Sequence, residues 1–174
     1  YDDFKRFHAE YYHPSNARIF FYGDDDPDKR LQLINKYLQD FDCRAVDSAV
    51  TLQKPGKDPK TVLHSFTSEQ KKGMVTVNWL LEETKQPDIN MAFHLLDYML
   101  LGMPGSPLRK TLIDSGLGED LTGGGLESEL QQLFFSIGLK GIDPDKAQEV
   151  ERLIFTTLKK LVTDGFDEET KEAA

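Results

Sequence analysis

The spacing of apolar residues along the chain predicts four helices, and helix start and stop signals predict one more at residues 107–116. In chain order, a short helix covers residues 4–13, a second covers 27–41, a third runs from Pro87 to Gly102 and a short fourth covers 107–116. A long fifth helix runs from Pro144 to Gly165. In the second helix the apolar positions fall on one face, which we expect to be buried; they are Leu31, Ile34, Leu38 and Phe41.

Alternating or continuous apolar runs predict the strands. The first strand covers residues 17–24, and a long loop over 43–60 follows the second helix. Residues 61–67 and 74–82 alternate in character around a polar turn, so we expect an antiparallel hairpin. A weak strand and a strong one lie within 119–142. Because this order lacks a strict βαβ repeat, it predicts an α+β fold: an open, mainly antiparallel sheet with helices packed on one face.

Composition limits the classes of function. A chain of 174 residues with 39% hydrophobic content is long enough for one domain with a proper core. The formal charge of −9 argues against nucleic acid as a partner and favours basic peptides. No apolar run is long enough to span a membrane, so we expect no membrane partner. A lone Cys43 allows no internal disulfide and fits a reducing compartment. Both ends of the chain look cut from something longer, the C-terminal end in particular.

Two histidines and a glutamate near the start form the pattern H-x-E-x-x-H, at His8, Glu10 and His13. Zinc hydrolases of the inverted class need H-x-x-E-H, which places both histidines on one helical face. A spacing of five puts His8 and His13 about 140° apart on a helix. We therefore expect surface or helix-end histidines here and no metal site in this chain. The other two histidines, His64 and His94, lie on apolar faces and are expected in the core or at its boundary.

The other candidate residues for catalysis or metal binding are also expected to have structural roles. Among the aspartates of DDDP, Asp26 precedes Pro27 and predicts a helix N-cap, with Asp25 and Asp28 near the positive end of the helix. Ser106 before Pro107 and Asp143 before Pro144 predict two further caps. The serines have no G-x-S-x-G frame and Cys43 has no local partner, so no catalytic residue is predicted.

The segment GMPGSPLRKTLIDSGLGEDLTGGGLESEL rises above this background. Three consecutive glycines beside a strand add no packing, which suggests that another backbone comes close to them. A bound extended peptide could supply that backbone by adding a strand to an exposed edge of the sheet. A flexible hairpin turn explains the same glycines and remains open.

The runs FKRFHAEYYHPSNARIFFYGDDDP, LLGMPGSPLRKTLIDSGLGEDLTGGGLESEL and FFSIGLKGIDPDKAQEVERLI resemble pitrilysin/insulinase-type zinc metallopeptidases of the presequence protease subgroup. The likeness covers nearly the whole chain and implies the second, non-catalytic domain. Residues 1–16 then correspond to the end of a linker helix from the catalytic domain, and 17–174 to the inactive peptidase-like domain. In this family the H-x-x-E-H helix and its zinc belong to the preceding domain.

The resemblance also implies a function and a candidate site. The parent enzyme would degrade targeting presequences and other short unstructured peptides in the mitochondrial matrix or plastid stroma, whereas the isolated chain would be inactive. Substrate would dock at an exosite whose matching positions are Gly102, Gly105, Leu121 and Gly123. Met103 stands where insulin-degrading enzymes have a histidine. The partners would be other domains of the same polypeptide and basic peptides, with self-association of the fragment as a risk.

The alternative is a non-catalytic structural or core-type subunit, or a peptide-binding module, of the same fold. An intact H-x-x-E-H motif in the parent sequence would distinguish the enzyme from the scaffold.

Overall fold

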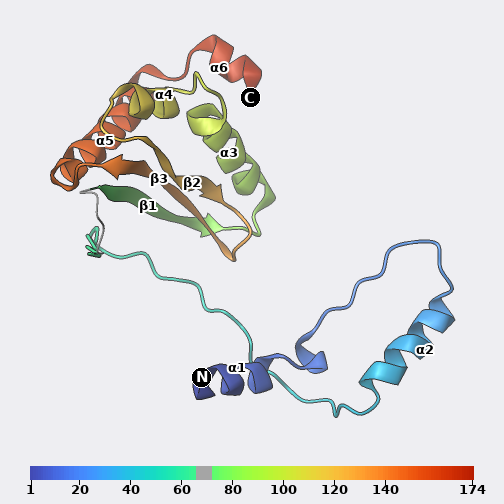
Figure 1. Cartoon of the computed structure of the whole chain (residues 1–174). Helices are drawn as coiled ribbons and strands as arrows, with labels where there is room; N and C mark the ends of the chain where they lie inside the picture. The colour runs from blue at the N-terminus through green and yellow to red at the C-terminus, as the bar shows by residue number, and fades with distance from the viewer. Residues whose placement is uncertain (66–71) are drawn as a thin grey trace. The chain divides into compact units, whose positions relative to one another are not determined.

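A computed structural model describes residues 1–65 and 72–174 of the chain. The chain divides into two compact units, which cover residues 1–51 and 52–174 and are coloured from blue to red along the chain in Figure 1. The helices of the first unit bury no residue, whereas the second unit contains the core.

The first unit is helical. Its elements are α1 (Asp2–Tyr11), the 3₁₀ turn η1 (Pro14–Asn16) and α2 (Pro27–Leu38), which confirms the two helices expected in this region. The Asp26 side chain accepts hydrogen bonds from the backbone N–H groups of Asp28 and Lys29 and so caps α2, as predicted. Asp25 instead forms an ion pair with Arg30. The predicted cap at the start of α2 is thus correct, whereas α2 ends at Leu38, before the expected end at residue 41.

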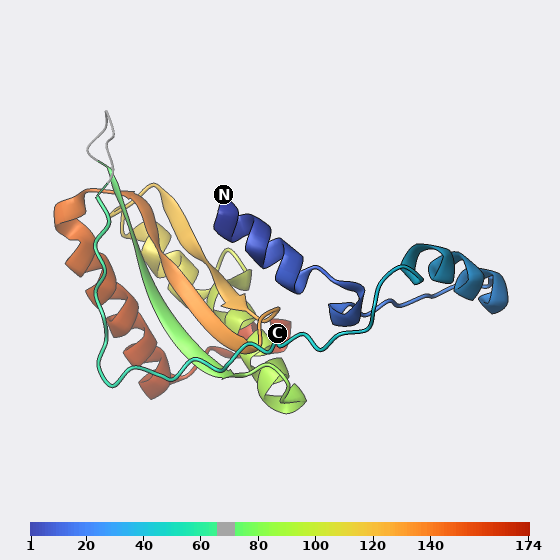
Figure 2. The same ribbon diagram turned by 90° about the horizontal axis from the view of Figure 1, so that it is seen from below.

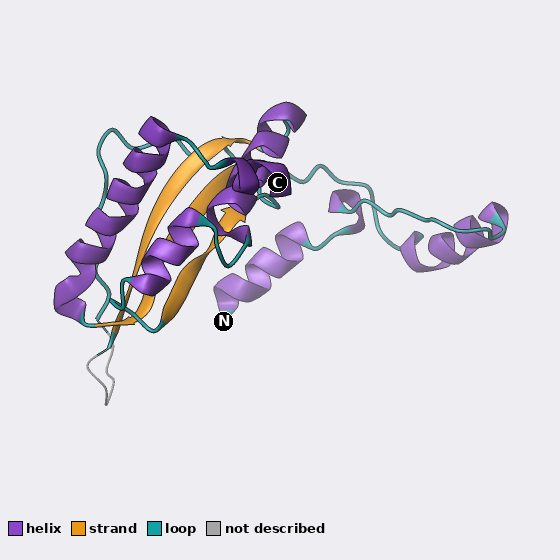
Figure 3. Ribbon diagram, turned by 90° about the horizontal axis from the view of Figure 1, so that it is seen from above, coloured by secondary structure: helices purple, strands orange, loops and turns teal. Residues whose placement is uncertain are grey.

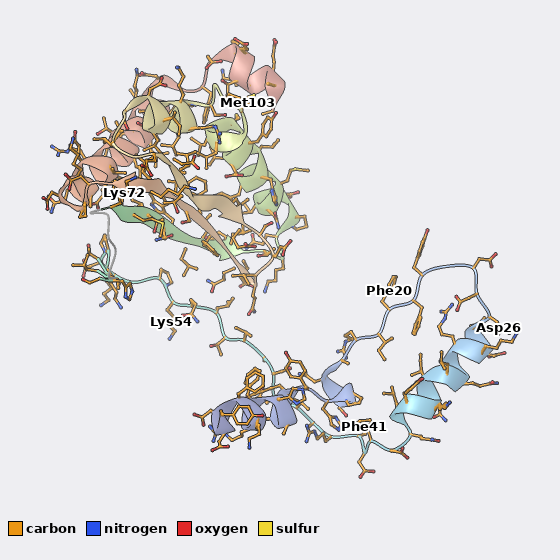
Figure 4. All side chains as sticks on the ribbon, viewed as in Figure 1. Phe20, Asp26, Phe41, Lys54, Lys72 and Met103 are labelled. Carbon is orange, nitrogen blue, oxygen red and sulfur yellow. The ribbon has the colours of Figure 1, made fainter. Side chains whose placement is uncertain are left out.

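Two expectations for the first unit are wrong. Residues 17–22 form irregular backbone instead of a strand, and the labelled Phe20 lies on this segment (Figure 4). The exposed fraction is 87% for Phe20 and 96% for Tyr22. A strand requires a neighbour for its N–H and C=O groups, and the first unit contains none. The apolar face of α2 is not buried either, because Leu31 is 62% exposed.

The second unit is built on three antiparallel strands: β1 (Gly73–Glu83), β2 (Asp120–Glu127) and β3 (Gln132–Ile142). Their order is β1-β3-β2, so β3 is central. The expected hairpin between 61–67 and 74–82 is wrong as far as it can be seen, because residues 61–65 are irregular and β1 pairs with β3. The remainder of that expectation, at 66–71, lies outside the described residues.

The helices of this unit lie on one face of the sheet, as the opposite views of Figures 2 and 3 show. This arrangement confirms the expected α+β class. The helical elements, in chain order, are α3 (Pro87–Asp97), the π-helical turn η2 (Tyr98–Gly102), α4 (Pro107–Asp114), the 3₁₀ turn η3 (Pro144–Lys146), α5 (Ala147–Asp164) and α6 (Glu168–Ala173). Of the α-helices in this unit, only α6 was not expected from the sequence. None of the helices in the described residues combines the length and apolar character that crossing a membrane requires.

One hydrophobic core joins the sheet to these helices. The helices α4 and α5 contribute Leu108, Leu112, Val150 and Ile154, and β3 contributes Ile137, Leu139 and Ile142. All of these side chains are at most 1% exposed. Asp143 accepts a hydrogen bond from the Asp145 N–H and caps the turn before α5, as predicted. The core therefore holds β3 in the middle of the sheet and leaves β2 at its edge.

Candidate functional site

The glycine run lies within β2, the strand at one edge of the three-stranded sheet. Thr122 pairs with Gly138 and Gly125 pairs with Ser136, so Gly123 and Gly124 together oppose one residue of β3. The φ angle of Gly123 is +81°, in the left-handed region that favours glycine. An extra residue with glycine in this conformation defines a G1 β-bulge. The flexible hairpin turn considered for these glycines is therefore wrong.

The backbone that approaches Gly123 belongs to the chain itself. A Cβ added at Gly123 would lie 2.5 Å from the carbonyl oxygen of Ser136 and 2.8 Å from the backbone nitrogen of Ile137. A Cβ added at Gly125 would meet the Asp97 carboxylate, whereas one at Gly124 would have no atom within 4 Å. Gly123 and Gly125 are thus required by neighbouring parts of the fold, and Gly124 faces open space.

The loop between η2 and α4 holds the second half of the candidate site. The buried Ser106 stabilises this loop through two hydrogen bonds. Its Oγ accepts one from the Met103 N–H at 3.0 Å and donates one to the Tyr98 carbonyl at 3.2 Å. Ser106 does stand at the N-cap position of α4, but its side chain does not cap the helix amides as expected, since it is used for the loop. Met103 is labelled in Figure 4. The loop is therefore fixed from inside and presents Gly105, around which a Cβ would meet nothing.

Two carboxylates bind backbone N–H groups of β2. Asp97, from the end of α3, accepts the Leu126 N–H at 3.1 Å, and Asp120 accepts the Leu121 N–H at 2.8 Å. Burial raises the pKa of Asp97, while the Leu126 N–H and the nearby His94 act in the opposite direction. A hydrogen bond from Lys140, 3.0 Å away, together with the Leu121 N–H, lowers the pKa of Asp120. Two N–H groups of β2 thus bind one exposed carboxylate, from Asp120 of the strand itself, and one partly buried carboxylate, from Asp97 of α3.

A cavity of about 150 Å³ lies between the sheet and the helices α3 and α5. Asp97 is the only titratable group in its lining; the other lining residues are Trp79, Leu81, Phe93, Leu96, Leu100, Leu126, Phe135 and Leu158. The sequence analysis did not assign a role to Asp97. The available signal was an acidic residue four positions after Phe93 and three before Leu100, on the apolar face of an otherwise regular helix.

The histidines of the N-terminal pattern do not fit a zinc site. The His8 ring stacks on Tyr12 with centroids 4.6 Å apart, and the His13 Nδ1 accepts the Ser15 N–H. Within residues 1–65 and 72–174, no three His, Cys, Asp or Glu side chains form a group that could hold a metal ion. The expectation of core positions for His64 and His94 is wrong, because both are exposed.

The structure places the four predicted site residues at three places, namely η2, the loop before α4, and β2. Gly102 ends η2 and Gly105 precedes α4, whereas Leu121 and Gly123 belong to β2. The end of η2 does approach β2, since a Cβ at Gly125 would lie 3.3 Å from Leu101. Gly105 lines a different feature, an open groove of about 590 Å³ along α4 that also includes Lys110 and Leu153.

Comparison with known proteins agrees with this architecture. The chain is 46% identical, over its whole length, to presequence protease 1, chloroplastic/mitochondrial, of Arabidopsis thaliana, of which it covers 17%. It is 35% identical over its whole length to protein HypA of Clostridium perfringens, of which it covers 18%. The chain therefore spans less than a fifth of these curated relatives.

A crystal structure of a protease from Helicobacter pylori has a similar fold, with a TM-score of 0.68 over 99% of this chain and 42% of that chain, at 22% identity. Residues 1–174 match the family described as the peptidase M16 inactive domain. Because that match includes every residue, the chain belongs to the peptidase M16 inactive-domain family.

Proposed function

We propose that this chain is a non-catalytic domain of a zinc metalloendopeptidase that degrades organellar targeting presequences and other short unstructured peptides. In that enzyme it forms part of the wall of a peptide chamber. The inactive-domain match and the 46% identity to a presequence protease support the assignment. We assign the zinc and its general base to another domain of the same polypeptide, an assignment that the inactive-domain match supports.

The second part of the proposal is that peptide substrate docks along β2. The observation that carries it is the position of β2 at the edge of the described sheet, with Gly124 open to a neighbouring backbone. An extended peptide can add to such an edge through main-chain hydrogen bonds. Gly102, Gly105, Leu121 and Gly123 are the proposed docking positions. The charge of −9 suits targeting peptides, which are basic and poor in acids.

The proposed location and partners follow from the same relative. Its printed name, chloroplastic/mitochondrial, supports a mitochondrial or plastid location, within which we propose the matrix or the stroma. We assign residues 1–16 to a linker helix and 17–174 to the inactive domain. Exposed aromatic side chains in the first unit, among them Phe4 at 67% and Tyr22 at 96%, favour cover by another domain of the polypeptide. In isolation the same surface favours self-association.

A fluorescent basic presequence peptide, titrated into the full chain with zinc present, tests the proposal. A Cβ added at Gly124 or at Gly105 would have no atom within 4 Å, so we expect Gly124→Val and Gly105→Val to obstruct a docked backbone and to leave the fold intact. Thr156→Val, on the exposed side of α5, is the matched control. We expect saturable binding that both glycine variants weaken several-fold and the control leaves unchanged, with no cleavage detected by mass spectrometry.

Each other outcome has a definite meaning. Zinc-dependent cleavage would overturn the non-catalytic assignment. Absence of binding would overturn docking and favour the structural or core-type subunit. Binding that neither glycine variant affects would move the docking site away from both β2 and the loop that holds Gly105.

A further inference from the structure

Two backbone N–H groups of β2 point to its outer edge. Leu121 pairs with Leu139 and Leu126 pairs with Phe135, and these partners are four residues apart on β3. Because backbone groups alternate in direction along an antiparallel strand, Leu121 and Leu126 have the same orientation, the bulge between them supplying the extra residue. Both N–H groups bind carboxylates, which is consistent with an orientation away from β3. These are the groups that an added strand would use.

The two carboxylates differ in how firmly they are held. Asp120 is adjacent in sequence to the amide it binds, and its side chain is 56% exposed beside Lys140. When the Asp120 side chain rotates away, a peptide carbonyl can take its place on the Leu121 N–H. Asp97 reaches the Leu126 N–H from α3, 29 residues away, and is partly buried against an apolar cavity. Its position also depends on Gly125, because a Cβ there would overlap the Asp97 Oδ1. The Asp97 carboxylate is therefore held in place at the edge of β2 by the surrounding fold.

We propose that Asp97 determines how far along β2 a peptide can dock. Its carboxylate accepts the hydrogen bond from the Leu126 N–H that a carbonyl of an added strand would otherwise accept. Because this N–H is already used, strand addition is confined to Asp120–Gly124. This inference rests on the proposed docking function and adds a specificity-determining residue to it. The docked stretch is then about three to five residues long, at the 3.3 Å rise of a strand. Such charged side chains at sheet edges also limit pairing with unwanted strands.

The test compares the full wild-type chain with Asp97→Asn and Asp97→Ala. The Asn side chain keeps an acceptor at the same place, whereas Ala removes it. Amide hydrogen exchange, read by NMR in the free chain, reports the Leu126 N–H directly. We expect slow exchange at Leu126 in the wild type and in Asp97→Asn, and markedly faster exchange in Asp97→Ala. Trp79 fluorescence confirms that each variant is folded.

The same experiment is repeated with the basic presequence peptide. In the wild type and Asp97→Asn, we expect new protection only over 120–124. In Asp97→Ala the protection should extend to Leu126, with affinity about three- to tenfold higher, as one additional net hydrogen bond implies. Protection of Leu126 by peptide in the wild type would overturn this inference and leave docking intact, as would equal footprints in all three chains. Absence of binding by every chain would overturn the docking proposal and this inference with it.

Discussion

Replacing Gly123 by alanine should strongly destabilise the second unit, although it adds only one methyl group. At φ +81° a non-glycine residue costs about 1–2 kcal/mol in a left-handed conformation. The new Cβ would also lie 2.5 Å from the Ser136 oxygen, so the backbone of β3 must shift. Overpacking against rigid structure costs about 1–3 kcal/mol. The sum is roughly 2–5 kcal/mol, or a fall in Tm of about 10 °C for a domain of this size.

Gly124→Ala is the matched control, because its Cβ would have no neighbour within 4 Å and its φ is not positive. Because alanine reduces the conformational freedom of the unfolded chain, the free energy of unfolding of Gly124→Ala should equal that of the wild type or exceed it by about 0.4–1 kcal/mol. The assay is thermal unfolding followed by fluorescence of Trp79, the single tryptophan, which packs on Phe135 and Phe155 in the second unit. A Gly123→Ala melting temperature within about 2 °C of the wild type would refute the argument, as would an equal loss in Gly124→Ala.

Two further predictions concern polar groups of the candidate site. Ser106→Ala removes the acceptor of the Met103 N–H and a donor to the Tyr98 carbonyl, so urea unfolding should show a loss of about 1–3 kcal/mol; an unchanged midpoint would contradict the assigned role of the loop serine. Burial raises the pKa of Asp97, so its contribution to stability is fully present below the usual value of 3.8 and is lost as the pH rises through the folded-state pKa. Asn does not titrate, so Asp97→Asn should not show that loss. The difference in free energy of unfolding between the wild type and Asp97→Asn should therefore change as the pH rises from 3.8 through the folded-state pKa of Asp97. Parallel pH profiles for the two chains would contradict the raised pKa.

Local signals in the sequence were sufficient for most of the helices. Periodic apolar residues marked α1, α2, α3 and α5, the Ser-Pro start and a terminal glycine marked α4, and an aspartate before a proline marked two of the helix starts. Helix hydrogen bonds and caps join residues a few positions apart, so a short stretch of sequence contains the information. The family resemblance likewise identified the inactive domain from contiguous runs of residues.

Strand pairing and the glycine site could not be obtained in this way. The expected partner of β1 was the neighbouring segment, but its partner is β3, about 60 residues later in the chain. The close backbone inferred at the glycine run proved to be β3, and the carboxylate on Leu126 comes from a helix 29 residues before it. The expected strand at 17–24 has no neighbour in its unit.

The sequence by itself therefore determined five of the helices, the caps at Asp26 and Asp143, the α+β class and the family of this protein, because those depend on local periodicity and contiguous motifs. Only the tertiary structure decided which strand is central, which glycines are required for packing and which backbone N–H groups of β2 are already occupied. These depend on contacts between residues far apart in the chain, and one residue type can satisfy such contacts in several ways. Asp97 illustrates the difference: in the sequence it interrupts an apolar face, and in the fold it binds the edge of the sheet.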